Sequence, residues 1–446
     1  MFTRVTPEES RAVSRRTGKR WLIGTMVLAG GLVAAACGSS TPSASPPKKH
    51  NTTTTQKKQK NSSTTTTTAP STTTTTAAGS TPTTTKTGTT PTTTKTGTTP
   101  TPTTTKTTTT PTTAASGGGA LGGALGGSND FNTPAAALTG AGSTFDQPLF
   151  ARQFYDFNKS NSKVTVNYAS VGSGTGESDI LAGSVNFGAS DVPEPSATTG
   201  SGGALLQVPV VLGGIAIVTK SCPSGVHITG TQITQIYKGT ITDWSSIPGC
   251  TAGPIEPVYR ADSSGTTNAF THYLNSVDPT DWPSSLVGKQ PTFPKGEGGN
   301  GNAGVAGDVE GGGGTVGYVE LDYALQSGLP YAAVQNSAGA YVLPSGASVA
   351  ADAAAFPNVT ADNYLIVNGS GAGAYPISTY SWIIVYQKQS NQNNGIALGK
   401  MLDWMATAGQ ADSSAIGYVA LPANIQSLAI ATIMKMQNSS GQNLFS

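Results

Sequence analysis

A tract rich in threonine and proline, over residues 38–127, most strongly limits where this chain can form a core. It consists largely of Thr, Pro, Ser, Gly, Ala and Lys, and a segment of that composition buries too little apolar surface to fold alone. Pro82, Pro91 and Pro100 recur every nine residues around copies of Thr-Thr-Thr-Lys-Thr-Gly-Thr-Thr. We therefore predict a disordered tether, which leaves about 310 residues from Ala135 onward for a folded part of two α/β lobes.

Residues 1–36 have the organisation of an export signal, with basic residues ahead of an apolar run over 21–36. The run ends at Val-Ala-Ala-Ala-Cys, which resembles the signal of bacterial lipoproteins, in which the cysteine is acylated after cleavage. The resemblance implies a lipid on Cys37, a tether over 37–134, and a protein anchored at the extracytoplasmic face of the cell membrane. Plain secretion after a cut at Ala36 is the alternative.

The part of the chain that we expect to fold is acidic. Residues 129–446 hold 11 Lys and Arg against 21 Asp and Glu, whereas residues 1–128 hold 14 against 2. A nucleic-acid-binding domain is usually basic, so we exclude nucleic acid as a partner. If the folded part captures an anion, it must use local dipoles and hydrogen bonds, because it has no general positive field.

The remaining cysteines, Cys222 and Cys250, predict a disulfide, because two cysteines of an exported protein usually pair. The three histidines lie far apart in the sequence, without the spacing of metal ligands. We therefore predict no metal site.

Three polar turns follow short apolar strands at the start of the expected folded part. Leu-Thr-Gly-Ala-Gly-Ser precedes Thr144 and Phe145, and Pro148 can begin a helix after them. Val-Gly-Ser-Gly-Thr-Gly places Ser173 at a second strand-to-helix turn, and Asn-Phe-Gly-Ala-Ser-Asp ends a third strand at Asp191. Backbone N–H groups point outward at such corners and can bind an anion.

The sequence Arg-Ala-Asp-Ser-Ser-Gly-Thr-Thr, from Arg260 onward, favours a further anion-binding loop. Ser263 or Ser264 can cap a helix that starts near Gly265, because apolar residues recur behind it at helical spacing. The first turn of that helix and its dipole favour an anion, and Arg260 offers a planar fork for the oxygens. Asp262 can hold the guanidinium in place. An ordinary capped helix beside a surface Arg–Asp pair is the alternative.

These four motifs, in this order, resemble the phosphate-binding protein of bacterial phosphate-specific ABC importers from about Leu138 to the C-terminus. The resemblance implies an α/β fold of the periplasmic-binding-protein type II class, with two lobes and two crossover strands that form a hinge. It assigns residues 135–213 and 374–446 to lobe I and residues 214–373 to lobe II. It also implies inorganic phosphate as ligand, the permease and ATPase subunits of an importer as partners, and neither catalysis nor a cofactor.

Carried over residue by residue, the resemblance places eight residues around phosphate and makes Asp262 the acidic partner of the arginine. The eight expected ligands are Thr144, Phe145, Ser173, Asp191, Arg260, Ser264, Gly265 and Thr266. The glycine-rich run from Glu310 to Gly314 is expected to be a surface loop.

Two alternatives for the function stay open at this point. The same fold could be tuned to another oxyanion such as sulfate or molybdate. A secreted phosphohydrolase could also use an arginine, serines and an aspartate, but the sequence suggests neither an activating histidine nor a metal cluster beside them.

Overall fold

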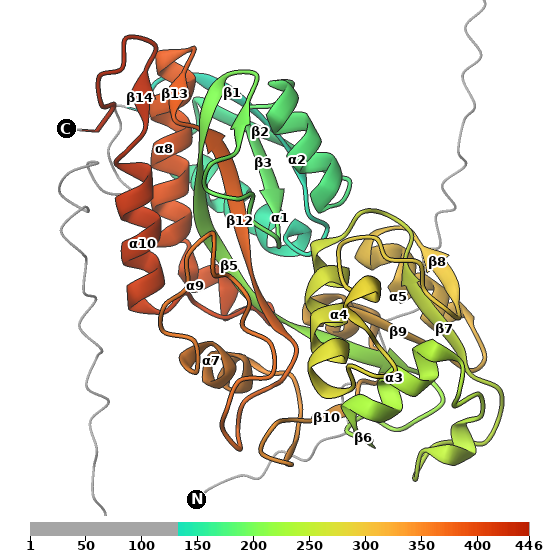
Figure 1. Cartoon of the computed structure of the whole chain (residues 1–446). Coiled ribbons are helices and arrows are strands. Elements are labelled where there is room, and N and C mark those ends of the chain that lie inside the picture. The colour runs from blue at the N-terminus through green and yellow to red at the C-terminus, as the bar shows by residue number, and fades with distance from the viewer. Residues whose placement is uncertain (1–132, 446) are drawn as a thin grey trace, which may run out of the picture. The chain divides into compact units, whose positions relative to one another are not determined.

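The computed structural model describes residues 133–445, which form an α/β fold arranged around one long strand (Figure 1). The predicted export signal, Cys37 and almost all of the predicted tether lie outside these residues. None of the helices within residues 133–445 combines the length and the apolar character needed to cross a membrane.

The main sheet contains nine strands, β1 (Ala136–Gly142), β2 (Val164–Ser170), β3 (Phe187–Ser190), β4 (Thr199–Gly200), β5 (Gly203–Thr219), β7 (Glu256–Arg260), β8 (Glu297–Gly299), β9 (Thr315–Glu320) and β12 (Ser378–Tyr386). Their order is β2-β1-β3-β12-β5-β9-β7-β8, and β4 pairs with β5 outside this order. The strands of two small sheets are β6 (His227–Ile228), β10 (Ala333–Gln335) and β11 (Tyr341–Val342), and β13 (Lys388–Gln389) and β14 (Gln437–Asn438).

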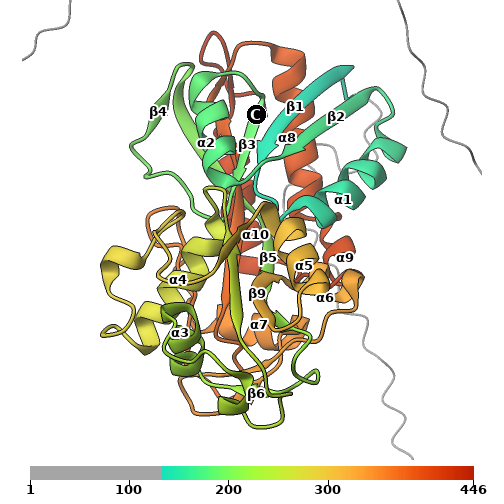
Figure 2. The same cartoon turned by 90° about the vertical axis from the view of Figure 1, so that its right-hand side faces the viewer.

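Strand β5 connects two lobes because it exchanges partners along its length. It pairs with β12 as far as Gly214 and with β9 from Ile215 onward. The chain returns to the first lobe through residues 374–377, which lie just before β12 begins at Ser378. We call this segment the return crossover. The predicted fold class is confirmed, and Figure 2 shows the two lobes above and below the exchange point.

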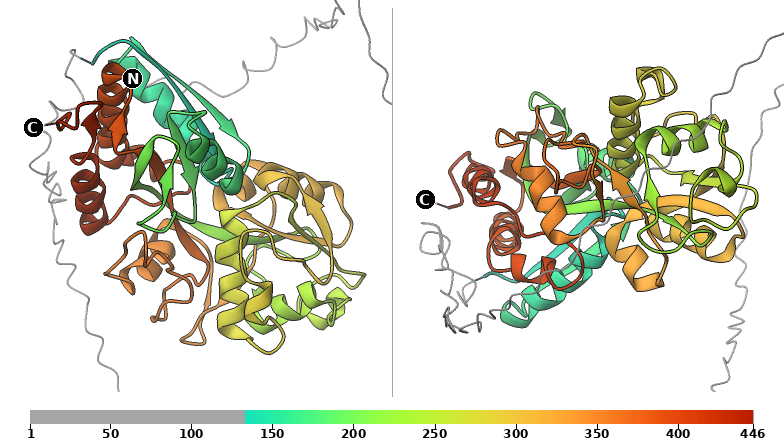
Figure 3. Two further views of the ribbon diagram at one scale, coloured as in Figure 1. Left: turned by 45° about the horizontal axis from the view of Figure 1, so that its top comes forward. Right: turned by 90° about the horizontal axis from the view of Figure 1, so that it is seen from below.

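Helices cover both faces of the sheet. They are α1 (Gln147–Ser160), α2 (Ser173–Ala182), α3 (Gly230–Lys238), α4 (Gly265–Val277), α5 (Gly301–Gly311), α6 (Leu321–Ser327), α7 (Gly346–Ala354), α8 (Gln392–Ala406), α9 (Gln410–Ser413) and α10 (Ala423–Ile433), with 3₁₀ turns η1 (Trp244–Ser246) and η2 (Ser284–Leu286). In the first lobe, α8 and α10 lie side by side along β5 and β12, with α2 on the other face (Figure 1). In the second lobe, α3 and α4 lie on one side of β9 and α5 and α6 on the other (Figure 2). Figure 3 shows, from two further directions, β5 running from the helices of the first lobe to those of the second.

Helix α5 corrects one prediction. Glu310 and Gly311 are its last two residues, so the expected surface loop is wrong for them, and only residues 312–314 lead from the helix to β9. Four glycines lower the intrinsic helix propensity here, but Val305 and Val309 are fully buried against β9. Gly317 of β9 permits this approach, since a Cβ there would lie 2.6 Å from Val305 Cγ1.

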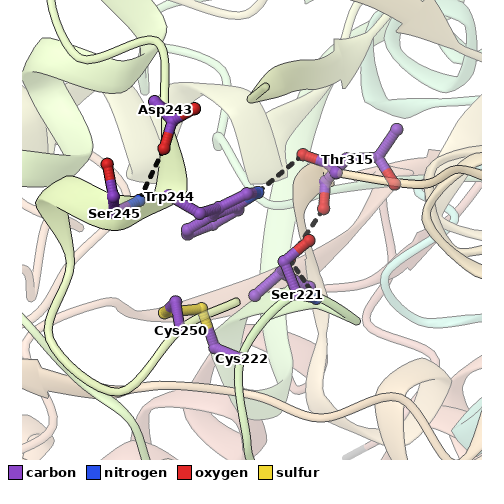
Figure 4. The surroundings of a disulfide bond; sticks show 9 residues. Ser221, Cys222, Asp243, Trp244, Ser245, Cys250 and Thr315 are labelled. Atoms are coloured by element: carbon purple, nitrogen blue, oxygen red, sulfur yellow. Dashed lines mark hydrogen bonds between the residues drawn. A yellow bond between two sulfur atoms is a disulfide. The ribbon is translucent and has the colours of Figure 1, made fainter. Parts of the chain in front are cut away.

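The predicted disulfide between Cys222 and Cys250 is confirmed (Figure 4). It joins the segment that follows β5 to the loop after η1. Next to it, Thr251 N donates to Ser221 O at 2.8 Å, and Trp244 Nε1 donates to the carbonyl of residue 314 at 2.9 Å. The bond therefore closes a region of the second lobe that is already hydrogen-bonded, away from the expected ligand residues.

Candidate functional site

The predicted ligand residues come together where the two lobes meet. All eight are buried, although they come from the ends of β1, β3 and β7 and the beginnings of α2 and α4. Hydrogen bonds between the lobes link most of them, so the site has to be described from both sides of the junction.

Thr144 and Phe145 occupy the turn between β1 and α1, as predicted. The hydroxyl Oγ1 of Thr144 accepts from the backbone N of Asn302 at 3.1 Å and from its side-chain Nδ2 at 2.9 Å. The backbone N of Phe145 donates to Ser143 Oγ at 3.1 Å. This corner of the first lobe is therefore held to the beginning of α5 in the second.

Ser173 begins α2 and contacts the beginning of α4. Its Oγ accepts from Gly265 N at 3.0 Å, and the next residue, Gly174, donates its backbone N–H to Ser263 O at 3.0 Å. Gly172 has a φ of 95°, and a Cβ there would lie 2.3 Å from Asp262 Oδ2. Glycine is thus required at this position both for its backbone conformation and for the close approach of the two lobes.

Asp191 follows β3 directly and is almost completely buried. Its Oδ1 accepts from Ser143 Oγ at 2.7 Å, and its Oδ2 accepts from Thr266 Oγ1 at 3.1 Å. Burial raises the pKa of Asp191, while the hydrogen bonds of Ser143 and Thr266 and the charge of Arg260 oppose that rise. The carboxylate is a hydrogen-bond acceptor placed among donors.

Arg260 is the last residue of β7, and its guanidinium is buried rather than on the surface. It makes a bidentate ion pair with Asp262, in which Nε donates to Oδ1 at 2.7 Å and Nη2 donates to Oδ2. Its Nη1 lies 3.3 Å from Thr266 Oγ1. Burial alone would raise the pKa of Asp262, but the hydrogen bonds and charge of Arg260 outweigh burial and lower it. The burial contradicts the alternative of a surface Arg–Asp pair.

Helix α4 begins at Gly265, as predicted, and Ser264 is its N-cap. The side chain of Ser264 accepts from Thr267 N at 3.1 Å, which leaves the hydroxyl proton for another acceptor. Tyr318 OH binds both Arg260 N, at 3.1 Å, and Thr267 Oγ1, at 2.7 Å. The arginine and the positive end of the helix dipole are thereby fixed relative to each other.

Two residues at the site are missing from the sequence-based prediction. Asn302 bridges the lobes, because it donates to Thr144 while its Oδ1 accepts from Glu320 N at 2.9 Å. The sequence did not indicate a role for Asn302, because it lies in a glycine-rich segment in which no helix was expected. Ser143 binds Asp191, and its position next to Thr144 in the same motif was the signal that could have identified it.

A cavity of about 440 Å³ opens beside the junction. It is lined by Thr144, Gln147, Ser170, Val171, Asp262, Asn300, Gly301, Ala303 and Tyr323. Next to it the site combines a buried guanidinium, hydroxyl groups and a helix N-terminus with one buried carboxylate. Within residues 133–445, no group of three or more His, Cys, Asp or Glu side chains is arranged to hold a metal ion. This chemistry suits the binding of an anion that also carries a proton.

Comparison with known proteins gives matches over most of the chain. A family model for the PBP superfamily domain matches residues 48–411. The phosphate-binding protein PstS of Xylella fastidiosa is 35% identical over 307 residues, covering 66% of this chain and 84% of the relative. The phosphate-binding protein PstS of Haemophilus influenzae is 33% identical over 307 residues, covering 66% of this chain and 91% of the relative.

Solved structures show a similar fold. The phosphate-binding protein of Stenotrophomonas maltophilia aligns with a TM-score of 0.53 and 24% identity, covering 67% of this chain and 94% of that protein. A DING protein aligns with a TM-score of 0.57 and 24% identity, covering 66% of this chain and 93% of that protein. At these identities the structural likeness supports the fold alone.

Proposed function

Because the chain belongs to the PBP superfamily and, within it, to the phosphate-binding proteins PstS, we propose that it captures inorganic phosphate between its lobes for an ABC-type importer. It acts by binding and release, without chemical change of the ligand. Two-lobe receptors of this kind close around a ligand by a hinge motion, and β5 with the return crossover before β12 is the hinge. The lobe boundaries expected from the sequence, at residues 213/214 and 373/374, are part of this proposal.

The observation that carries the proposal is the position of the Thr266 hydroxyl. It lies 3.3 Å from Arg260 Nη1 and 3.1 Å from Asp191 Oδ2, at the first turn of α4. A buried cation, a buried carboxylate acceptor and a helix N-terminus thus meet at one point. Phosphate near neutral pH needs all three, because it presents several negative oxygens and at least one proton.

We assign the binding roles according to the groups that each residue offers. Arg260 and the N-terminus of α4, with Ser264, Gly265 and Thr266, donate to the anionic oxygens. Thr144, Phe145 and Ser173 add donors from the first lobe, and Asp191 accepts the proton of the ligand. Asp262 orients the guanidinium through its bidentate ion pair.

Equilibrium binding to a panel of oxyanions tests this proposal. A ligand-stripped sample should bind phosphate far more tightly than sulfate or molybdate at pH 7. A phosphatase assay with a chromogenic phosphomonoester, run on the same sample, should show no turnover. Preference for sulfate or molybdate would support a receptor for a different oxyanion, and turnover would support the phosphohydrolase alternative.

We further propose that a lipid on Cys37 anchors the protein at the extracytoplasmic face of the membrane, where it meets the permease of the importer. The motif Val-Ala-Ala-Ala-Cys supports this localisation. In cells, Cys37→Ala should shift the protein from the membrane fraction to the medium. An unchanged membrane fraction would contradict the anchor, while leaving phosphate binding by the folded part unaffected.

A further inference from the structure

A second buried carboxyl group lies behind the proposed anion site. Asp146 is the N-cap residue of α1, but its side chain does not cap the helix. The residue has no exposed surface, and its Oδ2 is 2.8 Å from Ser381 Oγ on β12. Its Oδ1 is buried without a hydrogen-bond partner among the described residues. An ionised carboxylate is strongly disfavoured in such a position.

Ser381 connects this carboxyl group to Asp191. Its side chain is fully buried, and its Oγ lies 2.8 Å from Asp146 Oδ2. Hydrogen bonding by the same hydroxyl also lowers the pKa of Asp191, against the effect of burial. A hydroxyl group can donate one hydrogen bond while it accepts another. The 2.8 Å separation therefore also fits a hydrogen bond in which Asp146 is the donor and Ser381 the acceptor.

The titratable groups that interact with Asp146 are acids and tyrosines. The groups that interact with it are Asp191 after β3, Glu320 at the end of β9, Tyr168 on β2, Tyr323 on α6, and Tyr418. None of them is a cation. Burial, and next the charge of Asp191, raise the pKa of Asp146 well above its usual range.

The two carboxyl groups differ in how well an ionised form is supported. Asp191 accepts from Ser143 and Thr266 and also interacts with the charge of Arg260. Asp146 has Ser381 alone and one oxygen without a partner. When the pair holds one proton, the proton therefore belongs on Asp146 and the negative charge on Asp191.

We propose that Asp146 is a positioning residue for anion binding: it keeps a proton, donates it to Ser381 Oγ, and so directs the Ser381 hydroxyl proton toward Asp191. This inference rests on the proposed function. The relay holds Asp191 as an ionised, oriented acceptor for the proton of phosphate. It also keeps a second negative charge away from a site that must receive an anion.

Binding measurements on two variants at Asp146 test the proposal. Asp146→Ala removes the donor to Ser381, so the Ser381 hydroxyl is no longer directed toward Asp191. Phosphate affinity should fall about tenfold, the effect of losing the hydrogen bond from Ser381 to the charged Asp191. Asp146→Asn places an amide donor in the same position and should recover most of that loss. If Asp146 were ionised instead, both variants would remove a negative charge beside the ligand and would bind phosphate more tightly than the parent.

Three outcomes would overturn the proposal. Both variants could bind phosphate more tightly than the parent, or both could bind it with the affinity of the parent. Asp146→Asn could also fail to recover the phosphate affinity that Asp146→Ala loses. Infrared difference spectra of the parent and Asp146→Asn at pH 7 keep the test decisive if the Ala variant fails to fold. The parent should show the carbonyl band of one additional neutral carboxylic acid, and identical spectra would overturn the proposal. A parent that failed to bind phosphate would overturn the proposed function, while the infrared spectra would still decide the protonation of Asp146.

Discussion

Replacement of Asp191 by Asn should reduce discrimination between phosphate and sulfate more than it reduces phosphate affinity. Asp191 is the acceptor in a site whose other proposed ligands all donate. Phosphate brings a proton to that acceptor near neutral pH, whereas sulfate brings none. The carboxylate accepts from the hydroxyl groups of Ser143 and Thr266, at 2.7 Å and 3.1 Å, and hydroxyl groups can accept from an amide as well as donate, so the fold should tolerate Asn.

The size of the effect follows from the burial of Asp191. Sulfate would place a negatively charged oxygen against the Asp191 carboxylate, where phosphate can place a hydroxyl group. Two like charges about 4 Å apart repel by ~4 kcal/mol at an effective dielectric constant of about 20. Sulfate also lacks the hydrogen bond to a charged acceptor, which is worth about 1.5–3 kcal/mol. Together these terms amount to about 5.5–7 kcal/mol, a preference for phosphate of roughly 10⁴–10⁵, in line with other sites built around a required hydrogen bond. Asn removes the repulsion and supplies a donor, so the preference should fall at least about a hundredfold.

Competition titrations of phosphate against sulfate measure this ratio in the parent and in Asp191→Asn. Asp179→Asn, a half-buried change of equal charge on α2, is the matched control and should leave the ratio unchanged. Because burial raises the pKa of Asp191, the preference in the parent should also weaken as the pH is lowered and Asp191 takes up a proton. An unchanged ratio in Asp191→Asn would refute the reasoning.

Three further changes test other parts of the account. Arg260→Ala should weaken phosphate binding by about 1.5–3 kcal/mol in a calorimetric titration, and equal affinity would place the anion elsewhere. Burial raises the pKa of Asp352 from 3.8 to about 7. Between these two pH values the folded state keeps a proton that the unfolded state loses, so the free energy of unfolding falls as the pH rises from 3.8 to about 7. Asp352→Asn should remove the cost of ionising this buried carboxyl group, on the order of 4 kcal/mol at pH 8. If the free energy of unfolding in urea had the same pH dependence in parent and variant, this prediction would be wrong. Replacing Cys222 and Cys250 by Ser should lower the free energy of unfolding by about 3–4 kcal/mol, because the bond closes a loop with a sequence separation of 28, and an unchanged denaturation midpoint would argue against it.

Local signals in the sequence were sufficient for the strand-to-helix turns and for the N-cap of α4. Glycine turns and a capping serine act over a few residues, so Thr144, Ser173 and Ser264 could be placed at the ends of elements without knowledge of the fold. The order of the four motifs then indicated the two-lobe class. The burial of Arg260 could not be predicted from these signals, because it depends on tertiary packing with distant residues such as Tyr318, 58 residues further along the chain.

The features that the sequence did not predict depend on tertiary packing. Helix α5 forms in spite of its glycines because Val305 and Val309 bury their side chains against β9. Asp146 is an N-cap residue, and an aspartate at that position usually accepts a hydrogen bond from a backbone N–H of the helix. Its side chain instead contacts Ser381, 235 residues away in the sequence. Neither outcome can be read from local propensity, since the deciding partner is distant in the sequence.

A crystal structure of the protein saturated with phosphate would show where the anion binds. We expect one tetrahedral anion enclosed between the lobes, within hydrogen-bonding distance of the Arg260 guanidinium, the first turn of α4 and the Asp191 carboxylate. Density for phosphate at another place, or a junction without an anion at saturating phosphate, would contradict it.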